Sequence, residues 1–397
     1  KDITLNNATK WSFGSASNDT LTNESAYNGL VFTGAVKTES GKAHLVAPAG
    51  TTIEVPVKAG QNVNVGYYYQ ADFTVNGQTV TSNSGSTSKF ESSDFTANAD
   101  GTLTITVNTL TYFTGITVGT KVPYAENIYV GADKEYKTIN DALAAVRLMD
   151  RPNSERVTIN VDPGDYQEML VIDVDNVTLK NTAANPDTAL INKGVNITEN
   201  GVRVTSYYIH GYNYFSMTDD CKYDEEVLKT NKENGYLSFE NPGSGTTKNS
   251  YWNATVTVRG TGFEADGIIF ENSANQYIST KEANDVVQEW TVGGKGTRPT
   301  TAGDTSVQNK SFVERAAAIA ILGDKAYFNN CKFVGRQDTL YGASNIRAAF
   351  NKCTAMGGTD FIFGGMVATF YKSDIMMNTS EDNNDVAYLT AAQQASG

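Results

Sequence analysis

Alternation of apolar and polar residues dominates the first 120 residues of the chain. Residues 52–57 and 103–107 each place every second side chain on one apolar face, which is typical of strands with one buried side. Gly, Asn and Asp separate such runs, as expected of turns between strands. The pattern predicts a small β-sandwich domain at residues 1–122. Residues 67–69 and 73–77 are interpreted as a strand pair within it.

The pattern changes after a linker near residues 119–123. Residues 138–146 carry apolar side chains at positions 139, 142, 143 and 146, which is the spacing of an amphipathic helix. We expect this helix to cap the open end of a solenoid, because a terminal coil needs a polar outer face. Residues 203–250 and 275–312 do not fit the strand spacing and are expected to loop out beside a binding groove. Strands are predicted at 157–161, 169–172, 177–179 and 255–258.

Two stretches near the end of the chain repeat each other 22 residues apart. Segments 326–342 and 348–364 match in the order Ala, Phe, Asn, Cys, Gly, Asp and Gly. A fixed period in the low twenties predicts a solenoid with one coil per repeat. In a parallel β-helix, residues one coil apart are neighbours, about 4.8 Å apart in the strand-pairing direction. The sequence therefore predicts a parallel β-helix domain at residues 123–397, in which Asp338 stacks on Asp360.

These two stacked aspartates are the candidate catalytic residues. Two carboxylates this close resist ionising together, so one is pushed toward the acid form while the other stays anionic. An acid and a nucleophile would then come from the same repeat. The spacing alone leaves a polar ladder or a Ca²⁺ site as an equal alternative.

Composition narrows the function classes. The formal net charge is −13, which argues against a nucleic-acid or anionic-membrane partner. No apolar run approaches the length of a membrane span, and the polar start at Lys1 shows no signal peptide, so we interpret the chain as a mature or trimmed form. The polar, β-rich composition indicates a secreted, extracellular bacterial protein, which we expect to be a monomer.

The cysteines and histidines predict neither a metal centre nor a cofactor. Only His44 and His210 are present, and the three cysteines form no CxxC pair, so the ligand spacings of zinc sites are missing. Cys331 and Cys353 fall one coil apart and are interpreted as packed thiols rather than a disulfide.

Several segments match signatures of a known family. Residues 337–341 (Gln-Asp-Thr-Leu-Tyr) and 360–364 (Asp-Phe-Ile-Phe-Gly) match two signatures of the pectin methylesterases at that family's separation. Residues 164–168 match its earlier GxYxE, and residues 253–256 and 262–273 match the strand region between. Residues 128–397 thus resemble these carbohydrate esterases, and paired signatures are more specific than either alone. The resemblance implies an all-β fold, a right-handed parallel β-helix, preceded here by the small β-sandwich.

The resemblance also implies a mechanism without serine or histidine. Asp360 would attack the methyl-ester carbonyl of methyl-esterified homogalacturonan. Asp338 would protonate the departing methanol and then take a proton from water. Gln337 would donate to the oxyanion, and Tyr341 and Phe363 would line the sugar subsites.

The chain departs from the family pattern at two places. Arg315 stands one coil before Gln337, where the family usually has glutamine. A guanidinium is a fixed cation with several donors, so we expect Arg315 to serve the oxyanion or a structural role. The family also holds its nucleophile with an arginine in a later strand, and this chain has no arginine after Arg347. We therefore expect a chain truncated before its last coils.

Two alternatives stay open. Another pectin-active β-helix enzyme would be a pectate lyase, which needs Ca²⁺ and a base, or a polygalacturonase, whose carboxylates lie about 5–9 Å apart. The second alternative is a polysaccharide-binding module that has no catalytic activity. For the first domain, carbohydrate binding through aromatics such as Trp11 competes with a spacer whose aromatics are core, and the spacer is favoured.

Overall fold

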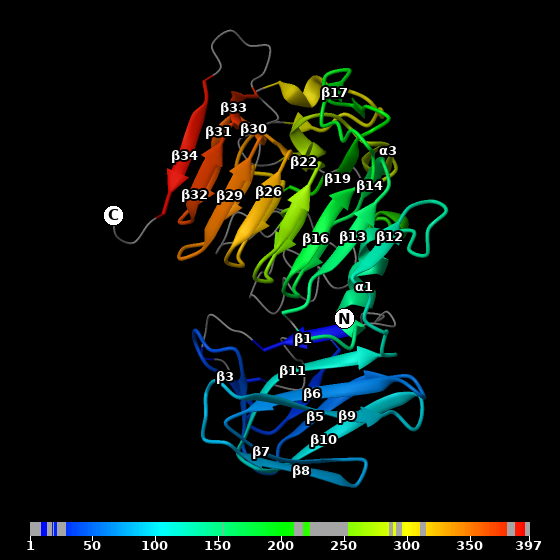
Figure 1. The fold of residues 1–397 in the computed structure, drawn as a ribbon, viewed down its shortest axis with the longest axis vertical. Coiled ribbons are helices and arrows are strands. Elements are labelled where there is room, and N and C mark those ends of the chain that lie inside the picture. Colours follow the sequence, from blue (N-terminus) through cyan, green and yellow to red (C-terminus); the bar gives the residue numbers. More distant parts are fainter. Residues whose placement is uncertain are drawn as a thin grey trace. The chain divides into compact units, whose positions relative to one another are not determined.

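The described residues divide into two units. The computed structural model describes residues 9–13, 18, 20–21, 29–152, 154–209, 217–222, 253–285, 289–290, 296–309, 315–378 and 386–393. One unit holds the described residues up to Pro123 together with Ala144–Asp150, and the other holds Tyr124–Leu143 and most of the chain from Arg151 onward. Figure 1 colours the first unit blue to cyan and the second cyan to red.

The first unit consists of two antiparallel sheets that share one hydrophobic core. Its strands alternate buried and half-buried residues, as in Thr52–Val57, because successive side chains point to opposite faces. Trp11 is fully buried in this core, so it is a packing residue rather than an exposed sugar platform. The sheet orders are β3-β4-β11-β6-β9, with β1 on β11, and β2-β5-β10-β7-β8. The strands are β1 (Thr9–Ser12), β2 (Val31–Thr33), β3 (Lys37–Thr38), β4 (Leu45–Ala47), β5 (Thr52–Val57), β6 (Asn62–Tyr68), β7 (Gln70–Val75), β8 (Gln78–Asn83), β9 (Phe90–Thr96), β10 (Gly101–Thr109) and β11 (Thr111–Gly119).

The predicted strand pair at 67–69 and 73–77 is wrong. Strands β6 and β7 follow each other in the chain, but β6 pairs with β9 and β11, whereas β7 pairs with β8 and β10. Tyr69 lies between them at φ 66°, in the left-handed region that redirects a chain sharply. The chain therefore crosses from one sheet to the other at Tyr69.

The second unit is a parallel β-helix (Figure 1). Successive coils place one strand in each of three parallel sheets, ordered β12-β13-β16-β21-β26-β29-β32, β14-β19-β22-β27-β30-β33 and β15-β20-β25-β28-β31-β34. The first sheet contains β12 (Asn127–Val130), β13 (Val157–Val161), β16 (Val177–Asn181), β21 (Glu264–Asp266), β26 (Ala326–Asn329), β29 (Arg347–Asn351) and β32 (Val367–Tyr371). The second contains β14 (Gly164–Gln167), β19 (Val202–Ser206), β22 (Ile268–Asn272), β27 (Lys332–Val334), β30 (Thr354–Gly357) and β33 (Asp374–Met377). The third contains β15 (Leu170–Ile172), β20 (Val256–Val258), β25 (Ile319–Ile321), β28 (Leu340–Gly342), β31 (Thr359–Gly364) and β34 (Tyr388–Ala392).

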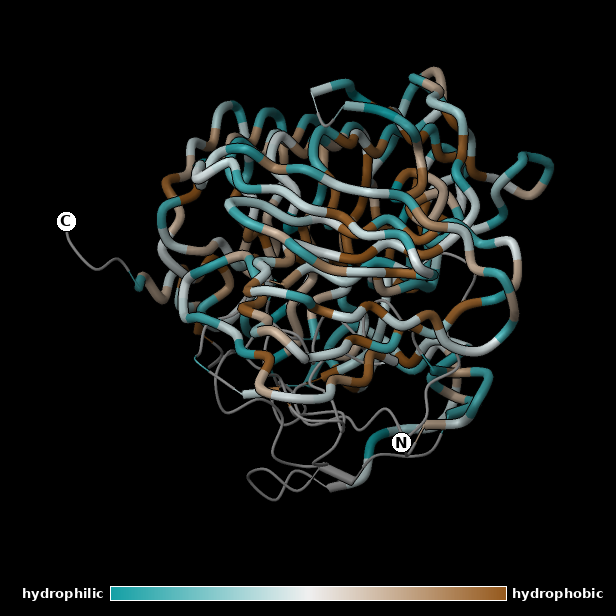
Figure 2. The backbone as a smooth tube through the Cα atoms, turned by 90° about the horizontal axis from the view of Figure 1, so that it is seen from below, coloured by the Kyte–Doolittle hydropathy of each residue, from teal (hydrophilic) through white to brown (hydrophobic). Residues whose placement is uncertain are grey.

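The 22-residue repeat sets the register of adjacent coils, as predicted. Ala326 pairs with Ala348, and Phe328 with Phe350. The Phe328 and Phe350 rings stack with centroids 5.1 Å apart, and Phe370 continues the stack at 4.5 Å. Because the same apolar residue recurs on each coil, the interior fills with stacked rings. Apolar stretches recur along the tube in Figure 2 as brown segments between paler ones.

The predicted helix is present as α1 (Ile139–Leu148). Its first N–H groups, on Ile139 and Asn140, donate to the Glu168 carboxylate at 2.9 and 3.0 Å. A carboxylate at this end stabilises a helix, because it satisfies N–H groups with no partner inside the helix. Glu168 is the last residue of the 164–168 signature, so that signature has a structural role here.

The first predicted insertion begins later than expected. Residues 202–206 form β19, paired on both sides by β14 and β22, so the first insertion starts after Ser206. All five β19 residues are buried, and a strand covered on both faces shows no alternation. The described connecting segments hold α3 (Thr280–Ala283), the hairpin strands β17 (Leu190–Ile191), β18 (Asn196–Ile197), β23 (Glu289–Trp290) and β24 (Gly296–Thr297), and short 3-10 turns at Asp219–Cys221, Ser273–Asn275 and Ser306–Gln308.

The cysteines are free thiols. Cys331 and Cys353 are both buried and unbridged, as predicted. Within the described residues, no helix is long and apolar enough to cross a bilayer.

Candidate active site

The two repeated aspartates lie at one corner of the β-helix, where the second parallel sheet passes into the third. Asp338 lies between β27 and β28, and Asp360 is the second residue of β31. Strand pairing keeps a 22-residue offset on both sides of the corner, with Val334 opposite Met356 and Leu340 opposite Ile362. Asp338 and Asp360 therefore occupy equivalent positions on adjacent coils.

The backbone at both aspartates is left-handed. Asp338 has φ 57° and Asp360 has φ 49°, a region that Asp tolerates better than most residues with a Cβ. The Asp338 N–H donates to the Thr359 carbonyl at 2.9 Å, which ties the two corners together. Asp338 is 5% exposed, whereas Asp360 is half-buried. The Asp360 carboxylate is thus the more open of the two.

Glycine makes the turn before each aspartate possible. A Cβ on Gly335 would lie 2.6 Å from the Thr339 hydroxyl oxygen, and one on Gly357 would lie 2.0 Å from the Phe361 Cβ. In both repeats the side chain four residues onward therefore folds over the glycine. This close approach places the aspartate at the apex of the corner.

Gly357→Ala should destabilise this corner. The new methyl group would overlap Phe361 at a buried position, and overpacking of this kind costs about 1–3 kcal/mol. Gly358→Ala is the matched control, because its Cβ would meet nothing closer than 3.5 Å. Thermal unfolding of both variants checks the prediction. Equal melting temperatures for the two would contradict the packing described here.

Arg315 and Gln337 are brought together as the sequence predicts. They form an isolated parallel bridge one coil apart, and the Ala316 N–H donates to the Gln337 carbonyl at 3.2 Å. Both side chains are half-buried. Gln337 immediately precedes Asp338, and Arg315 pairs with Gln337 from the coil before. One amide and one guanidinium therefore come from the coil of Asp338 and the coil that precedes it.

Tyr341 and Phe363 pair directly across β28 and β31. Their ring centroids are 5.0 Å apart at an interplanar angle of 54°. Tyr341 is half-buried and Phe363 is 6% exposed. Of the two predicted sugar-contact residues, Tyr341 therefore offers the larger accessible surface.

Arg336 and Arg347 are close to the aspartates in the sequence, but only Arg336 lies at the corner. Arg347 begins β29 in the first sheet and forms an exposed ion pair with Asp324 at 2.5 Å, so it is not at this corner. Arg336 adjoins Gln337 and is 1% exposed, which makes it a buried cation next to the candidate residues.

Buried asparagines brace the same corner on the coils before Arg315. The Asn253 amide donates to the carbonyls of Tyr208 and Arg315, at 3.1 and 3.0 Å. The Asn272 amide donates to the same Tyr208 carbonyl at 2.9 Å. Buried polar groups of this kind need partners, and here the partners are backbone groups at successive turns. Both asparagines belong to the family-like segments 253–256 and 262–273, and their hydrogen bonds connect Tyr208 with Arg315.

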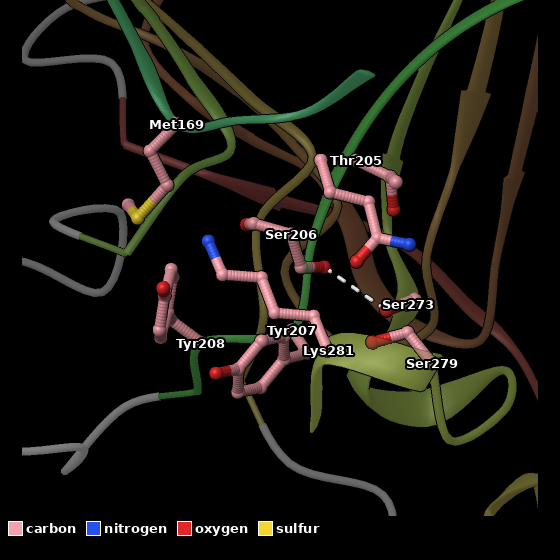
Figure 3. Close-up of a pocket in the computed structure, with 9 residues that line it drawn as sticks. Met169, Thr205, Ser206, Tyr207, Tyr208, Ser273, Ser279 and Lys281 are labelled. Atoms are coloured by element: carbon pink, nitrogen blue, oxygen red, sulfur yellow. Dashed lines mark hydrogen bonds between the residues drawn. The ribbon is translucent and has the colours of Figure 1, made fainter. Parts of the chain in front are cut away.

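A pocket at this corner was not predicted. It lies beside the ends of β14, β19 and β22 and has room for about one water molecule. Ser206, Tyr207, Tyr208 and Lys281 are among its lining residues (Figure 3). Sequence reasoning assigned these residues to insertions. The pattern Ser279-x-x-Glu282 signalled the start of α3, and the Ser279 hydroxyl does accept the Glu282 N–H at 3.0 Å.

An ion network lies behind the pocket. Arg203 bonds both carboxylate oxygens of Asp165 and lies 3.5 Å from Glu271. Tyr277 and Thr205 donate to the same Glu271 oxygen, at 2.7 and 2.8 Å. Burial raises the pKa of Glu271, and Arg203 opposes that shift. Arg203 also donates to the carbonyls of Gly194 and Val195 at 2.7 and 2.9 Å, so the network fastens a surface hairpin to the sheet.

The described residues include no cluster of three His, Cys, Asp or Glu side chains placed to hold a metal ion. The functional groups described at the corner are the two carboxylates, an amide, a guanidinium and an aromatic pair.

Comparison with known proteins finds similarity in part of the chain. Residues 275–396 match the family model described as pectinesterase. A pectinesterase of Ralstonia solanacearum is 35% identical over 123 residues, which cover 30% of this chain and 24% of that protein. A probable pectinesterase/pectinesterase inhibitor of Arabidopsis thaliana is 27% identical over 248 residues, covering 62% of this chain and 32% of that protein. The chain thus spans about a quarter to a third of the length of these relatives.

Two solved structures align with about two thirds of the chain. A pectin methylesterase from Erwinia chrysanthemi aligns at 23% identity with a TM-score of 0.42, covering 68% of this chain and 62% of that chain. A pectin methylesterase in complex with a hexasaccharide aligns at 22% identity and the same TM-score over the same shares. The segment that matches the pectinesterase family model, residues 275–396, contains both Asp338 and Asp360.

Proposed function

We propose that this chain hydrolyses the methyl esters of homogalacturonan, releasing methanol and leaving free galacturonate carboxylates. One observation carries the proposal. Asp338 and Asp360 occupy equivalent positions on adjacent coils, inside the segment that matches the pectinesterase family. Gln337 directly precedes Asp338, and Arg315 pairs with Gln337 from the coil before.

In the proposed reaction Asp360 is the nucleophile and Asp338 the acid. An Asp360 oxygen bonds to the ester carbonyl carbon, and the carbonyl electron pair moves onto its oxygen. When that pair returns, the bond to the methoxyl oxygen breaks, and Asp338 gives its proton to the departing methanol. Asp338 then takes a proton from water, whose oxygen attacks the substrate carbonyl carbon and releases Asp360. The difference in exposure between Asp338 and Asp360 supports these roles, because a nucleophile must reach the ester.

The negative oxygen formed in each half of the reaction needs donors. The Gln337 amide and the Arg315 guanidinium are the proposed donors, because Gln337 precedes Asp338 and Arg315 pairs with Gln337 on the same corner. Donors fixed in advance lower the barrier, since no reorganisation is needed when charge develops. Tyr341 and Phe363 are the proposed sugar contacts. We propose further that the protein acts as a secreted monomer, because its substrate is a polymer outside the cell.

Methanol release separates this proposal from its alternatives. The intact protein is incubated with methyl-esterified homogalacturonan, and methanol, new reducing ends and unsaturated products are measured together. An esterase yields methanol alone. A polygalacturonase yields reducing ends, a lyase yields unsaturated ultraviolet-absorbing products, and a binding module yields none of these, so any of those three results would overturn the proposal.

Arg315 provides a test of the oxyanion donors. Arg315→Gln should retain much of the wild-type kcat, because glutamine supplies a neutral donor at the same position. Arg315→Ala should lower kcat by about 10²-fold, the scale of a lost oxyanion donor. Steady-state methanol release measures both. If both variants match the wild type, Arg315 has only a structural role.

A further inference from the structure

A row of aromatic side chains crosses the outer face of one sheet of the first unit, over strands β11, β6 and β9 (Figure 1). Tyr68 pairs with Phe90, and Phe113, which follows Tyr112, pairs with Tyr67. Tyr67 and Phe113 are buried in the core. Successive residues of a strand point to opposite faces, so Tyr112, Tyr68 and Phe90 lie together on the outer face. This aromatic row crosses two strand spacings, about 10 Å.

The rings of the aromatic row contact one another and are open to solvent on one side. Tyr68 and Phe90 stack, with centroids 5.4 Å apart and planes inclined by 6°. Tyr112 meets Tyr68 and Tyr69 edge-on, with centroids 6.1 and 5.7 Å apart. Phe90 is 65% exposed and Tyr69 is 37% exposed, and the other two rings are half-buried. Exposed apolar rings that gather in one place on a surface are typical of an interaction site.

A buried histidine holds the tyrosines of the row in position. His44 is 4% exposed, and its Nε2 lies 2.6 Å from the Glu39 carboxylate. Its Nδ1 is hydrogen-bonded to the Tyr68 hydroxyl. Since an ionised carboxylate only accepts, Nε2 donates to Glu39 and Nδ1 accepts from Tyr68. His44 also meets Tyr112 edge-on, with centroids 5.1 Å apart. Both tyrosine rings are therefore fixed before a ligand binds, which lowers the entropy cost of binding.

The surroundings of the row suit a sugar better than a protein. The Tyr69 and Tyr112 hydroxyls have no hydrogen-bond partner among the described residues, and each can donate or accept. The next outward positions on β6 and β9 are Gly66 and Ser92, which pair with each other. The apolar surface is thus a narrow strip with small and polar neighbours. The core of a protein interface is a broader apolar patch, whereas a sugar uses one strip of ring surface with partners for its hydroxyl groups.

The charges around the row are balanced. Lys89 and Glu91, on either side of the exposed phenylalanine in the sequence, pair at 3.3 Å. Glu39 is bound to His44, and Lys37 lies in β3 at the edge of the same sheet. A polymer with a carboxylate on each unit would meet as many anions as cations here and would gain no net attraction. The balance of charge therefore favours an uncharged ligand.

We propose that the aromatic row of Tyr112, Tyr68 and Phe90 binds an uncharged polysaccharide. The C–H groups of a pyranose face carry partial positive charge and aromatic faces carry partial negative charge, so the two surfaces attract each other. The sugar hydroxyl groups bond the hydroxyls of Tyr69 and Tyr112. The row belongs to a different unit of the chain from Asp338 and Asp360. It gives the protein a second class of ligand, which the two aspartates do not hydrolyse.

Titration calorimetry of the intact protein with cellohexaose, and separately with β-1,4-linked galactohexaose, tests the site, because both probes are uncharged. The wild type should bind at least one of them. Phe90→Ala should weaken that binding about tenfold, the scale of one lost ring contact, and Phe90→Tyr should retain most of the affinity because it keeps the ring. Tyr129→Ala is the matched control, since Tyr129 is also exposed, at 46%, but lies in β12 of the β-helix.

Two further measurements separate this site from the proposed function and from a protein partner. Phe90→Ala should release methanol from soluble methyl-esterified homogalacturonan at the wild-type rate, and sedimentation velocity should give the same mass for both proteins. The inference is overturned if the wild type binds neither probe, if Phe90→Ala binds like the wild type, or if Tyr129→Ala loses as much affinity. Self-association of the wild type that Phe90→Ala abolishes would also overturn it. A wild type that binds a probe through Phe90 but releases no methanol would reject only the esterase.

Discussion

Asp360→Asn is expected to abolish methanol release, with kcat reduced on the order of 10⁴-fold or more, the scale on which enzymes lose activity when a nucleophile is removed. Asparagine keeps the size of the side chain but lacks the anionic oxygen that attacks the ester. Asp360 is half-buried and adopts a left-handed φ of 49°, which asparagine also tolerates. The fold should therefore survive. Single-turnover methanol release, with circular dichroism of the same sample, checks both statements.

Asp374→Asn is the control for this substitution. Asp374 begins β33 in the second sheet, is exposed and lies away from the corner, so its loss should leave kcat unchanged. Asp338→Asn should be as damaging as Asp360→Asn, because both halves of the proposed reaction need its proton transfer. An Asp360→Asn protein that retains kcat within tenfold of the wild type would exclude Asp360 as the nucleophile.

Arg203→Met is expected to cause the largest loss of stability, about 3–5 kcal/mol, because it leaves a buried charge without its partner. Glu271 is 0% exposed, and Arg203 is the cation that opposes the rise of its pKa caused by burial. The substitution also removes the donors to Gly194 and Val195. Chemical denaturation of the intact protein measures this loss of stability. The unfolding transition of the β-helix is the signal to follow.

Two further variants separate charge from packing at Arg203. Adding Glu271→Gln to Arg203→Met should recover part of the stability, because the buried residue is then neutral. Arg347→Met removes an arginine from an exposed pair with Asp324 and should change stability little, since exposed pairs contribute little. If Arg203→Met and Arg347→Met had equal effects, the buried network would not stabilise the fold as described.

The repeat makes the β-helix and its corner predictable from the sequence. Matching residues at a fixed spacing predict the register of β26 with β29 and of β28 with β31, and therefore the equivalent positions of Asp338 and Asp360. The same offset links Arg315 to Gln337, which pair as expected. Local repetition is enough here because each coil contacts only its neighbours.

Other features depend on contacts that the local sequence does not reveal. Strand β19 is buried on both faces, so it lacks the alternation that marks a strand. The sheet crossing at Tyr69 requires a left-handed tyrosine, which is rare and has no sequence signal. The pocket that Gln167, Ser206 and Lys281 line combines residues from β14, β19 and α3, which are far apart in the sequence. No short motif joins them.

The most direct test of the central claim is a crystal structure of the intact Asp338→Asn protein with a methyl-esterified oligogalacturonate. Loss of the acid should slow turnover enough for the ester to remain bound while Asp360 stays intact. We expect an Asp360 carboxylate oxygen about 3–3.5 Å from an ester carbonyl carbon, the separation of a near-attack geometry, with the methoxyl group on the side of residue 338. An oligosaccharide bound with every ester away from Asp360 would contradict the assignment of this corner as the esterase site.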